Sequence, residues 1–137
     1  DTEIPHVRIC ECPWRPLKTG SSERDVPLVG AALWATERTY ECSSNEYLFP
    51  SYCSEKGCKA DYASNSLNKW LRQHVQNGCV VHSFRHSMRD RLRAVECPSE
   101  VIDQNGGWQT SSLGERYGLG YHLTAIQRWI LVVSFET

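Results

Sequence analysis

The stretch VHSFRHSMRDRLRAVE, residues 81–96, gathers side chains that bind or titrate beside a negatively charged group. His82 and Arg85 are three residues apart, and Arg89 and Arg93 follow at intervals of four. Because spacings of three and four fall on one side of a helix, these side chains are expected to share a face. Such a helix would present histidine and arginine together on one surface.

The charge around this face is positive, although the 137-residue chain carries a formal charge of only −1. Between residues 69 and 93, six bases stand against one acid, Asp90, which leaves +5 (six minus one). The bases are Lys69, Arg72, Arg85, Arg89, Arg91 and Arg93. A local excess of this kind suits a polyanionic partner. A solvated helix face, balanced by acids elsewhere, is the alternative.

Three more single residues have types that could take part in chemistry. Lys18 lies in a loop rich in Gly and Ser, Trp108 follows Gly106 and Gly107 directly, and Tyr117 lies nine residues further on. Taken singly, a turn lysine, a core tryptophan and a surface tyrosine are ordinary features of a globular domain. The order and combination of these residues is therefore the informative feature.

Seven cysteines are many for this chain, and their number is odd. Because there is enough apolar material for a core, we expect most of them to be reduced thiols in a cytosolic protein. Cys10 and Cys12 form a C-x-C pair, and Cys53 and Cys58 form a C-x4-C pair. Together with Cys79 and His74 they suggest a zinc site, but the spacing matches no standard ligand pattern. The sequence therefore predicts no metal and no other cofactor.

A β-hairpin is expected to carry Lys18. Residues 6–12 alternate apolar and polar side chains and predict a strand, and residues 24–28 predict a short return strand. The Pro-, Gly- and Ser-rich segment between them predicts a turn with Lys18 near its tip. Pro27 lacks the N–H that a central strand needs, so this strand should lie at an edge.

Helices are expected to carry the remaining candidates. Predicted helices cover 28–38, about 64–77, 81–96, 98–105 and 123–130, with an extended segment at 47–51 and an irregular loop at 51–63. Ser64 or Asn65 should cap the second helix and Gly78 should end it. Ser112 and Glu115 fit a capping box for a last turn that carries Tyr117.

Apolar spacing predicts which faces of these helices are buried. The second helix places Leu67, Trp70, Leu71, His74 and Val75 on one face. The third helix places Phe84, Met88, Leu92 and Val95 in a core stripe, opposite its basic side. Both helices are therefore expected to pack into the core.

Length and composition favour one domain over residues 1–137, a mainly helical α+β fold with a small antiparallel sheet at its start. Hydrophobic residues make up 40% of the chain, yet no run of 18 apolar residues suggests a membrane span. The opening DTEIPHVR is unlike a signal peptide. A cytoplasmic location is expected.

Together these motifs resemble the tyrosine recombinase (phage integrase) family, from roughly Ile9 to Tyr121. The matching stretches are KTGSSERDVPL at 18–28, EYLFPS at 46–51, SLNKWL at 66–71, HSFRH at 82–86, GGW at 106–108 and ERYG at 115–118. In the family the nucleophilic tyrosine follows a G-H or G-W pair by nine residues. That spacing favours Tyr117 over Tyr121.

The resemblance implies DNA strand cleavage and rejoining through a 3′-phosphotyrosyl link. Tyr117 would attack the scissile phosphate, and Arg85 would grip its oxygens with a planar fork. His82 would hydrogen-bond the phosphate or help take the tyrosine proton, and Lys18 would give a proton to the 5′ oxygen. Trp108 would donate its indole N–H, which neither gains nor loses a proton, so its role would be positional.

The implied partner is double-stranded DNA. Backbone contacts would come from Arg89, Arg93, Lys69 and Arg72, which position a duplex without reading its sequence. His86, frequent after this motif in the family, is interpreted as structural. The apolar tail QRWILVVSF, 127–135, would pack on a neighbouring protomer in a synaptic complex, and folding back on its own core is the alternative.

The chain departs from the family pattern near its start. Family members carry another catalytic arginine, with an acidic partner, well before the hairpin lysine, but only 17 residues precede Lys18 here. Neither Arg8 nor Arg15 matches that position. The resemblance therefore covers the C-terminal part of a catalytic domain, without the N-terminal DNA-binding domain. Because a missing phosphate ligand costs several kcal/mol of transition-state stabilisation, this chain alone is expected to be inactive.

Three other functions fit parts of the pattern. A DNA-binding or regulatory remnant would keep the fold without the chemistry, and the absent arginine favours it. A relaxing topoisomerase would use the same chemistry without a synaptic partner. A structural module stabilised by zinc would use the cysteines.

Overall fold

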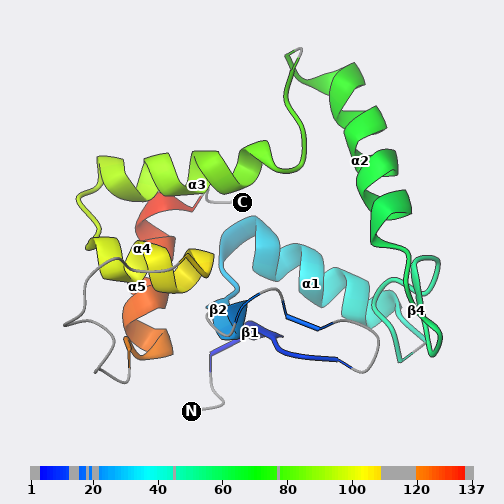
Figure 1. Cartoon of the computed structure of the whole chain (residues 1–137), viewed down its shortest axis with the longest axis horizontal. Coiled ribbons are helices and arrows are strands. Elements are labelled where there is room, and N and C mark those ends of the chain that lie inside the picture. The colour runs from blue at the N-terminus through cyan, green and yellow to red at the C-terminus, as the bar shows by residue number, and fades with distance from the viewer. Residues whose placement is uncertain are drawn as a thin grey trace.

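The computed structural model describes residues 4–12, 16–17, 19, 22–44, 46–76, 78–108 and 120–134. Over these residues the chain has a mixed α+β fold that is mainly helical, with a two-stranded antiparallel sheet near its start (Figure 1). The predicted fold class is confirmed at this level. Lys18, Tyr117 and the predicted turn at 112–117 lie outside the described residues.

The first sheet pairs β1 (His6–Ile9) with β2 (Arg24–Pro27) in antiparallel register, with Val7 opposite Val26. The predicted hairpin is therefore present, with shorter strands than the predicted 6–12 and 24–28. Leu28 N–H donates to Pro5 O (2.8 Å) just past the last pair, where Pro27 itself has no N–H to offer.

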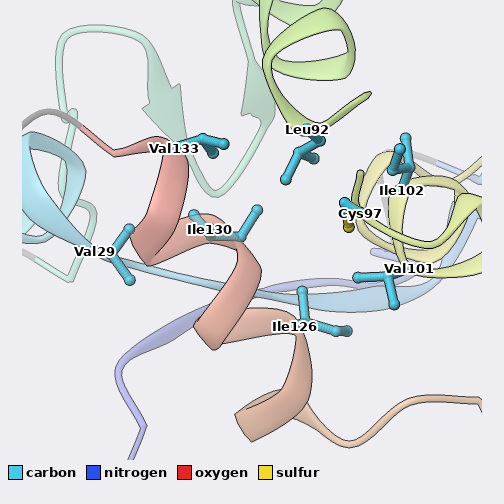
Figure 2. Close-up of a cluster of buried hydrophobic side chains, with 8 residues drawn as sticks. All are labelled: Val29, Leu92, Cys97, Val101, Ile102, Ile126, Ile130 and Val133. Atoms are coloured by element: carbon cyan, nitrogen blue, oxygen red, sulfur yellow. The ribbon is translucent and has the colours of Figure 1, made fainter. Parts of the chain in front are cut away.

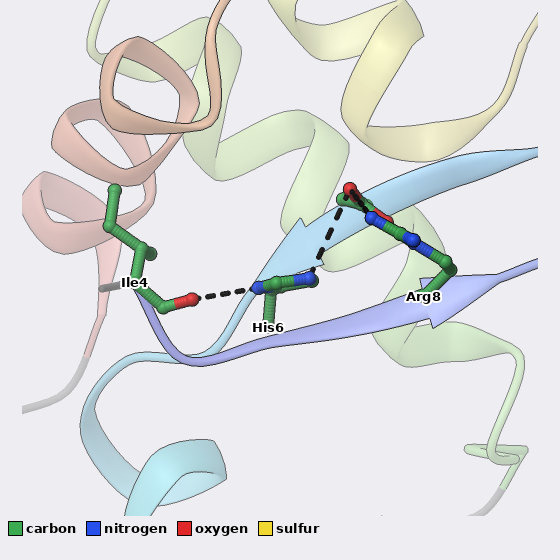
Figure 3. Close-up of polar contacts among 4 residues, drawn as sticks. Ile4, His6 and Arg8 are labelled. Atoms are coloured by element: carbon green, nitrogen blue, oxygen red, sulfur yellow. Dashed lines mark hydrogen bonds and ion pairs between the residues drawn. The ribbon is translucent and has the colours of Figure 1, made fainter. Parts of the chain in front are cut away.

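A polar cluster stabilises the outer side of this hairpin (Figure 3). Arg8 donates to both carboxylate oxygens of the cross-strand residue Asp25, at 2.9 and 3.1 Å. His6 lies between Asp25 Oδ2, at 3.9 Å, and the carbonyl of Ile4, at 2.7 Å. The hydrogen bond from Arg8 lowers the pKa of the Asp25 carboxyl group below its ordinary value.

The connection between the hairpin and the third helix differs from the prediction. Helix α1 (Gly30–Cys42) is longer than the predicted 28–38, and none of its residues is buried. Residues 47–51 are not extended, because Pro50 begins a turn in which Phe49 O accepts the N–H groups of Tyr52 and Cys53. The predicted loop at 51–63 contains a short ladder of β3 (Cys53–Ser54) and β4 (Gly57–Cys58), and its last residues, 60–63, are helical.

Helix α2 (Ala60–His74) begins four residues before Ser64, so the predicted cap at Ser64 or Asn65 is wrong. The flanking residue is Lys59, whose side chain makes no cap. Ala60 and Ala63 favour helix, and Asp61 stabilises the first turn through the helix dipole, so helix extends past the better capping residues.

The predicted apolar face of α2 is mostly solvent-exposed. Leu71 is buried, but Trp70 is 54% exposed, and Leu67 and Val75 are exposed as well. Figure 1 shows why: α2 stands apart from the helices that form the core. Hydrophobic spacing identified the apolar side of the helix correctly, but it did not reveal whether another element covers it.

The core forms where β2 and three helices meet: α3 (Ser83–Ala94), α4 (Ser99–Gly106) and α5 (Leu123–Val133). Its buried side chains are Val29, Leu92, Cys97, Val101, Ile102, Ile126, Ile130 and Val133 (Figure 2). Met88 and Val95 pack against this cluster as predicted, whereas Phe84 is 65% exposed and does not join the stripe. Phe84 lies in the first turn of α3, where its side chain faces solvent.

Helix α5 extends past the predicted end at 130. Val133 is buried in the core, and Arg91 donates to its carbonyl, so this part of the apolar tail folds back onto the chain itself. Leu131 and Val132, in the same last turn, remain exposed. Among the residues described, no helix is both long enough and apolar enough to cross a membrane.

Candidate functional site

The start of α3 is held by hydrogen bonds from neighbouring side chains. Asn68 Oδ1 on α2 accepts the N–H of Val81 (2.8 Å), and Ser83 Oγ accepts the N–H of Val80 (3.1 Å). His82 flanks the first residue of the helix with an exposed side chain, and its carbonyl accepts the N–H of Arg85 (3.1 Å). The H-x-x-R motif therefore lies at the start of α3 and spans one turn of the helix.

The Arg85 side chain extends from α3 to the C-terminal end of α4. Its guanidinium lies over the ring of Trp108, 4.1 Å from the ring centroid, and its Nη2 donates to Gly106 O at 2.6 Å. A guanidinium over an indole face is attracted by the ring quadrupole. Two residues that the sequence singled out separately are thus in direct contact.

The two glycines before Trp108 shape this contact. Helix α4 ends in a Schellman motif, in which Gly107 takes a left-handed conformation (φ 64°) and donates to Gln104 O, while Trp108 N donates to Asp103 O at 2.9 Å. This reversal folds the indole ring back over Gly106, where any Cβ would overlap it. The GGW motif therefore fixes where the tryptophan ring lies.

Arg24, at the first position of β2, is a component of this site that sequence reasoning missed. Its Nε donates to Asn105 O at 2.9 Å, and its Nη1 donates to Ser22 O at 2.7 Å. A Cβ on Gly107 would come too close to its guanidinium. Arg24 thus ties the hairpin to the C-terminal end of α4. The only sequence signal was its place inside the KTGSSERDVPL stretch, because 81 residues separate it from Asn105.

Arg89 completes the group, which we call the arginine–tryptophan cluster: Arg24, Arg85, Arg89 and Trp108. The Arg89 guanidinium lies 4.6 Å from the Trp108 ring centroid, and its Nη2 is 3.9 Å from Asp103 Oδ1. Among the described residues its buried Nε has no hydrogen-bond partner. Arg89 therefore lies with Arg85 rather than on the outer surface of α3.

The side chains of the cluster carry a net positive charge. Three guanidinium groups and the Asp103 carboxylate sum to +2 (three minus one). Arg24 and Arg85 donate to the consecutive carbonyls of Asn105 and Gly106, where the dipole of α4 is negative. Burial lowers the pKa of Arg24, and repulsion from the nearby Arg85 lowers it further. A bound anion would relieve this repulsion.

The other predicted DNA contacts lie away from the cluster. Arg93 is exposed near the end of α3, and Lys69 and Arg72 are exposed on α2. Figure 1 shows α2 and α3 as separate arms joined by a loop, so the basic segment does not form one continuous face. His86 is exposed on α3, with its ring edge-on to that of His82 (5.0 Å between centroids).

The residues considered for zinc do not come together. Within the described part of the chain, no three His, Cys, Asp or Glu side chains are grouped as metal ligands would be. His74 stacks on Trp70 with 4.3 Å between ring centroids, and its Nδ1 lies 2.8 Å from the carbonyl of the same residue. Cys53 and Cys58 contact each other, and no third candidate ligand joins them.

Comparison of the chain with protein-family models, with curated proteins and with solved structures found no match in any of the three. The functional interpretation of the cluster therefore depends on the chemistry of its residues and on the sequence motifs.

Proposed function

We propose that this protein binds double-stranded DNA and supplies part of the catalytic machinery that cuts and rejoins its strands through a 3′-phosphotyrosyl link, as in tyrosine recombinases. This chain alone is expected to be inactive. The observation that carries the proposal is the contact between Arg85 and Trp108, 23 residues apart in the sequence. Two more guanidinium groups lie at the same helix end. Planar guanidinium forks match the paired oxygens of a phosphodiester, so the cluster suits this substrate.

Arg85 is the proposed ligand of the scissile phosphate. Its Nη2 donates to Gly106 O, and the remaining N–H groups of the same guanidinium would donate to phosphate oxygens. The Trp108 ring holds the guanidinium plane, so the fork loses little freedom when it binds. His82, exposed one turn earlier, is proposed to donate to the phosphate or to take a proton.

Chain connectivity limits where the nucleophile and the acid lie. Tyr117 follows Trp108 by nine residues, a segment that reaches at most about 32 Å when fully extended. Lys18 precedes Arg24 by six residues, which reach at most about 22 Å. These lengths set the largest distance at which each residue can lie from the cluster.

In the proposed reaction Tyr117 attacks the phosphorus atom and its O–P bond forms as the bond to the 5′ oxygen breaks. Lys18 gives its proton to that oxygen, and the tyrosine proton leaves through His82 or solvent. Rejoining reverses these steps, because the phosphotyrosyl link conserves the energy of the phosphodiester bond that was broken. The residues supply the nucleophile, the charge stabilisation and the proton, and the proposal invokes no metal or other cofactor.

Lys69, Arg72 and Arg93 are proposed to hold the DNA backbone beside the cut. All three are exposed, Lys69 and Arg72 on α2 and Arg93 on α3, away from the cluster, which suits phosphates spread along a duplex. We place the reaction in the cytoplasm of a bacterial host, where a phage or another mobile element recombines. Self-association through the exposed last turn of α5 would bring two such sites together.

A trapping assay tests the chemistry. A suicide duplex of the native attachment region, nicked beside the cleavage position, is incubated with the protein expressed from its complete reading frame. A protein band that carries labelled DNA, and that is lost in Tyr117→Phe, is the expected result. Replacing the bridging 5′ oxygen by sulfur makes a leaving group that needs no acid, so it should restore trapping to Lys18→Ala but not to Tyr117→Phe.

The same assay separates the main alternative, a DNA-binding or regulatory remnant without catalysis. Such a protein would shift the duplex in a mobility assay and give no covalent band with either substrate. Failure to bind DNA at moderate salt would contradict both functions, because both require phosphate contacts from the basic residues.

A further inference from the structure

Two cysteines face each other on the short ladder between α1 and α2. Cys53 on β3 and Cys58 on β4 are direct cross-strand partners, and their Sγ atoms lie 2.8 Å apart. Both are free thiols, Cys58 exposed and Cys53 half-buried. Neither takes part in the arginine–tryptophan cluster, so what they do is independent of the function proposed above.

The hydrogen-bond register of the ladder brings their backbones close. Lys59 N–H donates to Tyr52 O at 2.7 Å, which makes 52 and 59 the hydrogen-bonded pair. Pair types alternate along an antiparallel ladder, so Cys53 and Cys58 form the non-hydrogen-bonded pair, whose Cα atoms lie about 4.5 Å apart. This separation is at the short end of the range that a disulfide spans.

The surroundings favour reaction at Cys58 first. Its exposed sulfur meets a molecule from solution more readily than that of Cys53. The hydrogen bond with Cys58, together with burial, raises the pKa of the Cys53 thiol, so Cys53 keeps its proton while the pair is reduced. Once Cys58 carries a leaving group, Cys53 is the sulfur next to it.

We propose that Cys53 and Cys58 form a reversible redox site that exchanges with small disulfides such as oxidised glutathione. The Cys58 thiolate attacks one glutathione sulfur, the S–S bond breaks, and one glutathione thiolate leaves. Cys53, as its thiolate, then attacks Cys58 Sγ and releases the second glutathione. Two protein thiols are oxidised to one disulfide, and one glutathione disulfide is reduced to two thiols.

Oxidation would stiffen the joint between α1 and α2. The ladder ends at Cys58, and α2 begins at Ala60 with Lys59 as its flanking residue. Helix α2 stands away from the core, so its direction depends strongly on this joint (Figure 1). A disulfide across the ladder would restrict the first turn of a helix whose exposed side carries Lys69 and Arg72.

Tryptic mapping after equilibration with oxidised glutathione tests the site. Trypsin cuts after Lys56, between the two cysteines, so a disulfide joins peptide 39–56 to peptide 57–59. Because Cys42 also lies in the first peptide, the experiment uses Cys42→Ser protein, in which only Cys53 can make the link. The expected result is the joined pair at two hydrogens below its summed mass, lost when reduced glutathione is added in excess.

Two variants keep the test specific. Cys79→Ser, which removes another exposed thiol, should leave the linked peptides unchanged. Cys53→Ser should abolish them and leave glutathione attached to Cys58. The proposal is overturned if Cys42→Ser protein accumulates only glutathione adducts at Cys58, or if Cys58 links to other cysteines as often as to Cys53.

Discussion

At the scale of single residues, Arg24 joins more parts of the site than any residue that was predicted from the sequence. It donates across 81 residues to Asn105 O and abuts Gly107, so it fixes the helix end that positions Trp108. The sequence predicted His82, Arg85 and Trp108 as site members because each lies in a short motif. No motif reports a hydrogen bond between a strand and a distant helix end.

Arg24→Ala should therefore destabilise the fold and loosen the cluster together. Loss of a guanidinium that donates to two carbonyls should lower the free energy of unfolding by roughly 1–2 kcal/mol, since the group is only partly buried. Urea denaturation measures this. Arg38→Ala, which removes an exposed α1 arginine, is the matched control and should stay within about 0.5 kcal/mol. Equal losses in both variants would contradict the role given to Arg24.

Asp25 makes the stability of the hairpin depend on acid. Its pKa is lowered in the folded state by the hydrogen bond from Arg8, so the unfolded chain binds more protons as the pH falls. The stabilisation is present above about pH 4 and is lost as the pH drops through the lower folded pKa. Thermal melts at pH 7 and pH 3 should show a smaller acid-induced loss for Asp25→Asn than for the unmodified protein.

Asp90→Asn removes the same kind of charge from an exposed position on α3 and serves as the control for this measurement. It should keep the acid-induced loss of the unmodified protein. If Asp25→Asn keeps that loss in full as well, the Arg8–Asp25 pair does not stabilise the folded hairpin.

At the scale of elements, the end of α4 organises the site. The Schellman motif turns the chain at Gly107, clears space at Gly106 for the indole ring, and exposes the carbonyls that Arg24 and Arg85 bind. The helix and its Gly-Gly stop were predictable, because Pro98 opens it and the glycines close it. The contacts of Arg24 and Arg85 with the carbonyls at this helix end were not predictable, because they depend on how β2, α3 and α4 meet.

Gly107→Ala tests this element. A Cβ in a left-handed residue costs about 1 kcal/mol, and here it would also press on the Arg24 guanidinium. The substitution should therefore cost less in an Arg24→Ala background, with a coupling of at least about 0.5 kcal/mol in a double-mutant cycle. Chemical denaturation of the four proteins gives the coupling, and strict additivity would show that Gly107 and Arg24 do not touch.

Elsewhere among the elements, prediction failed for identifiable reasons. The start of α2 was placed too late because Ser64 and Asn65 are good caps, while the helix-forming alanines before them carried more weight. The β3–β4 ladder is too short to show a strand pattern. Apolar spacing on α2 indicated a buried face, although only Leu71 is buried there.

At the scale of the whole molecule, the chain leaves apolar surface exposed on the last turn of α5. Leu131 is 51% exposed and Val132 is 63% exposed, beside the buried Val133. If this turn joins two protomers, changing Leu131 and Val132 together to serine should lower the sedimentation coefficient of the assembled protein. Trp34→Ser, which removes an exposed apolar side chain from α1, should not. A protein that sediments as a monomer at every concentration would contradict self-association through α5.

The most direct test of this proposal compares variants of Arg85 and Arg93, in the protein expressed from its complete reading frame, in the rate of phosphotyrosyl formation at saturating DNA. Both arginines lie on α3, but only Arg85 contacts Trp108 and the end of α4. Arg85→Ala should slow covalent complex formation by about 10²–10³-fold, because it removes charge stabilisation at the reacting phosphate. Arg93→Ala should weaken DNA binding and leave the saturated rate unchanged. Equal rates for the two variants would contradict the claim that the arginine–tryptophan cluster holds the phosphate that reacts.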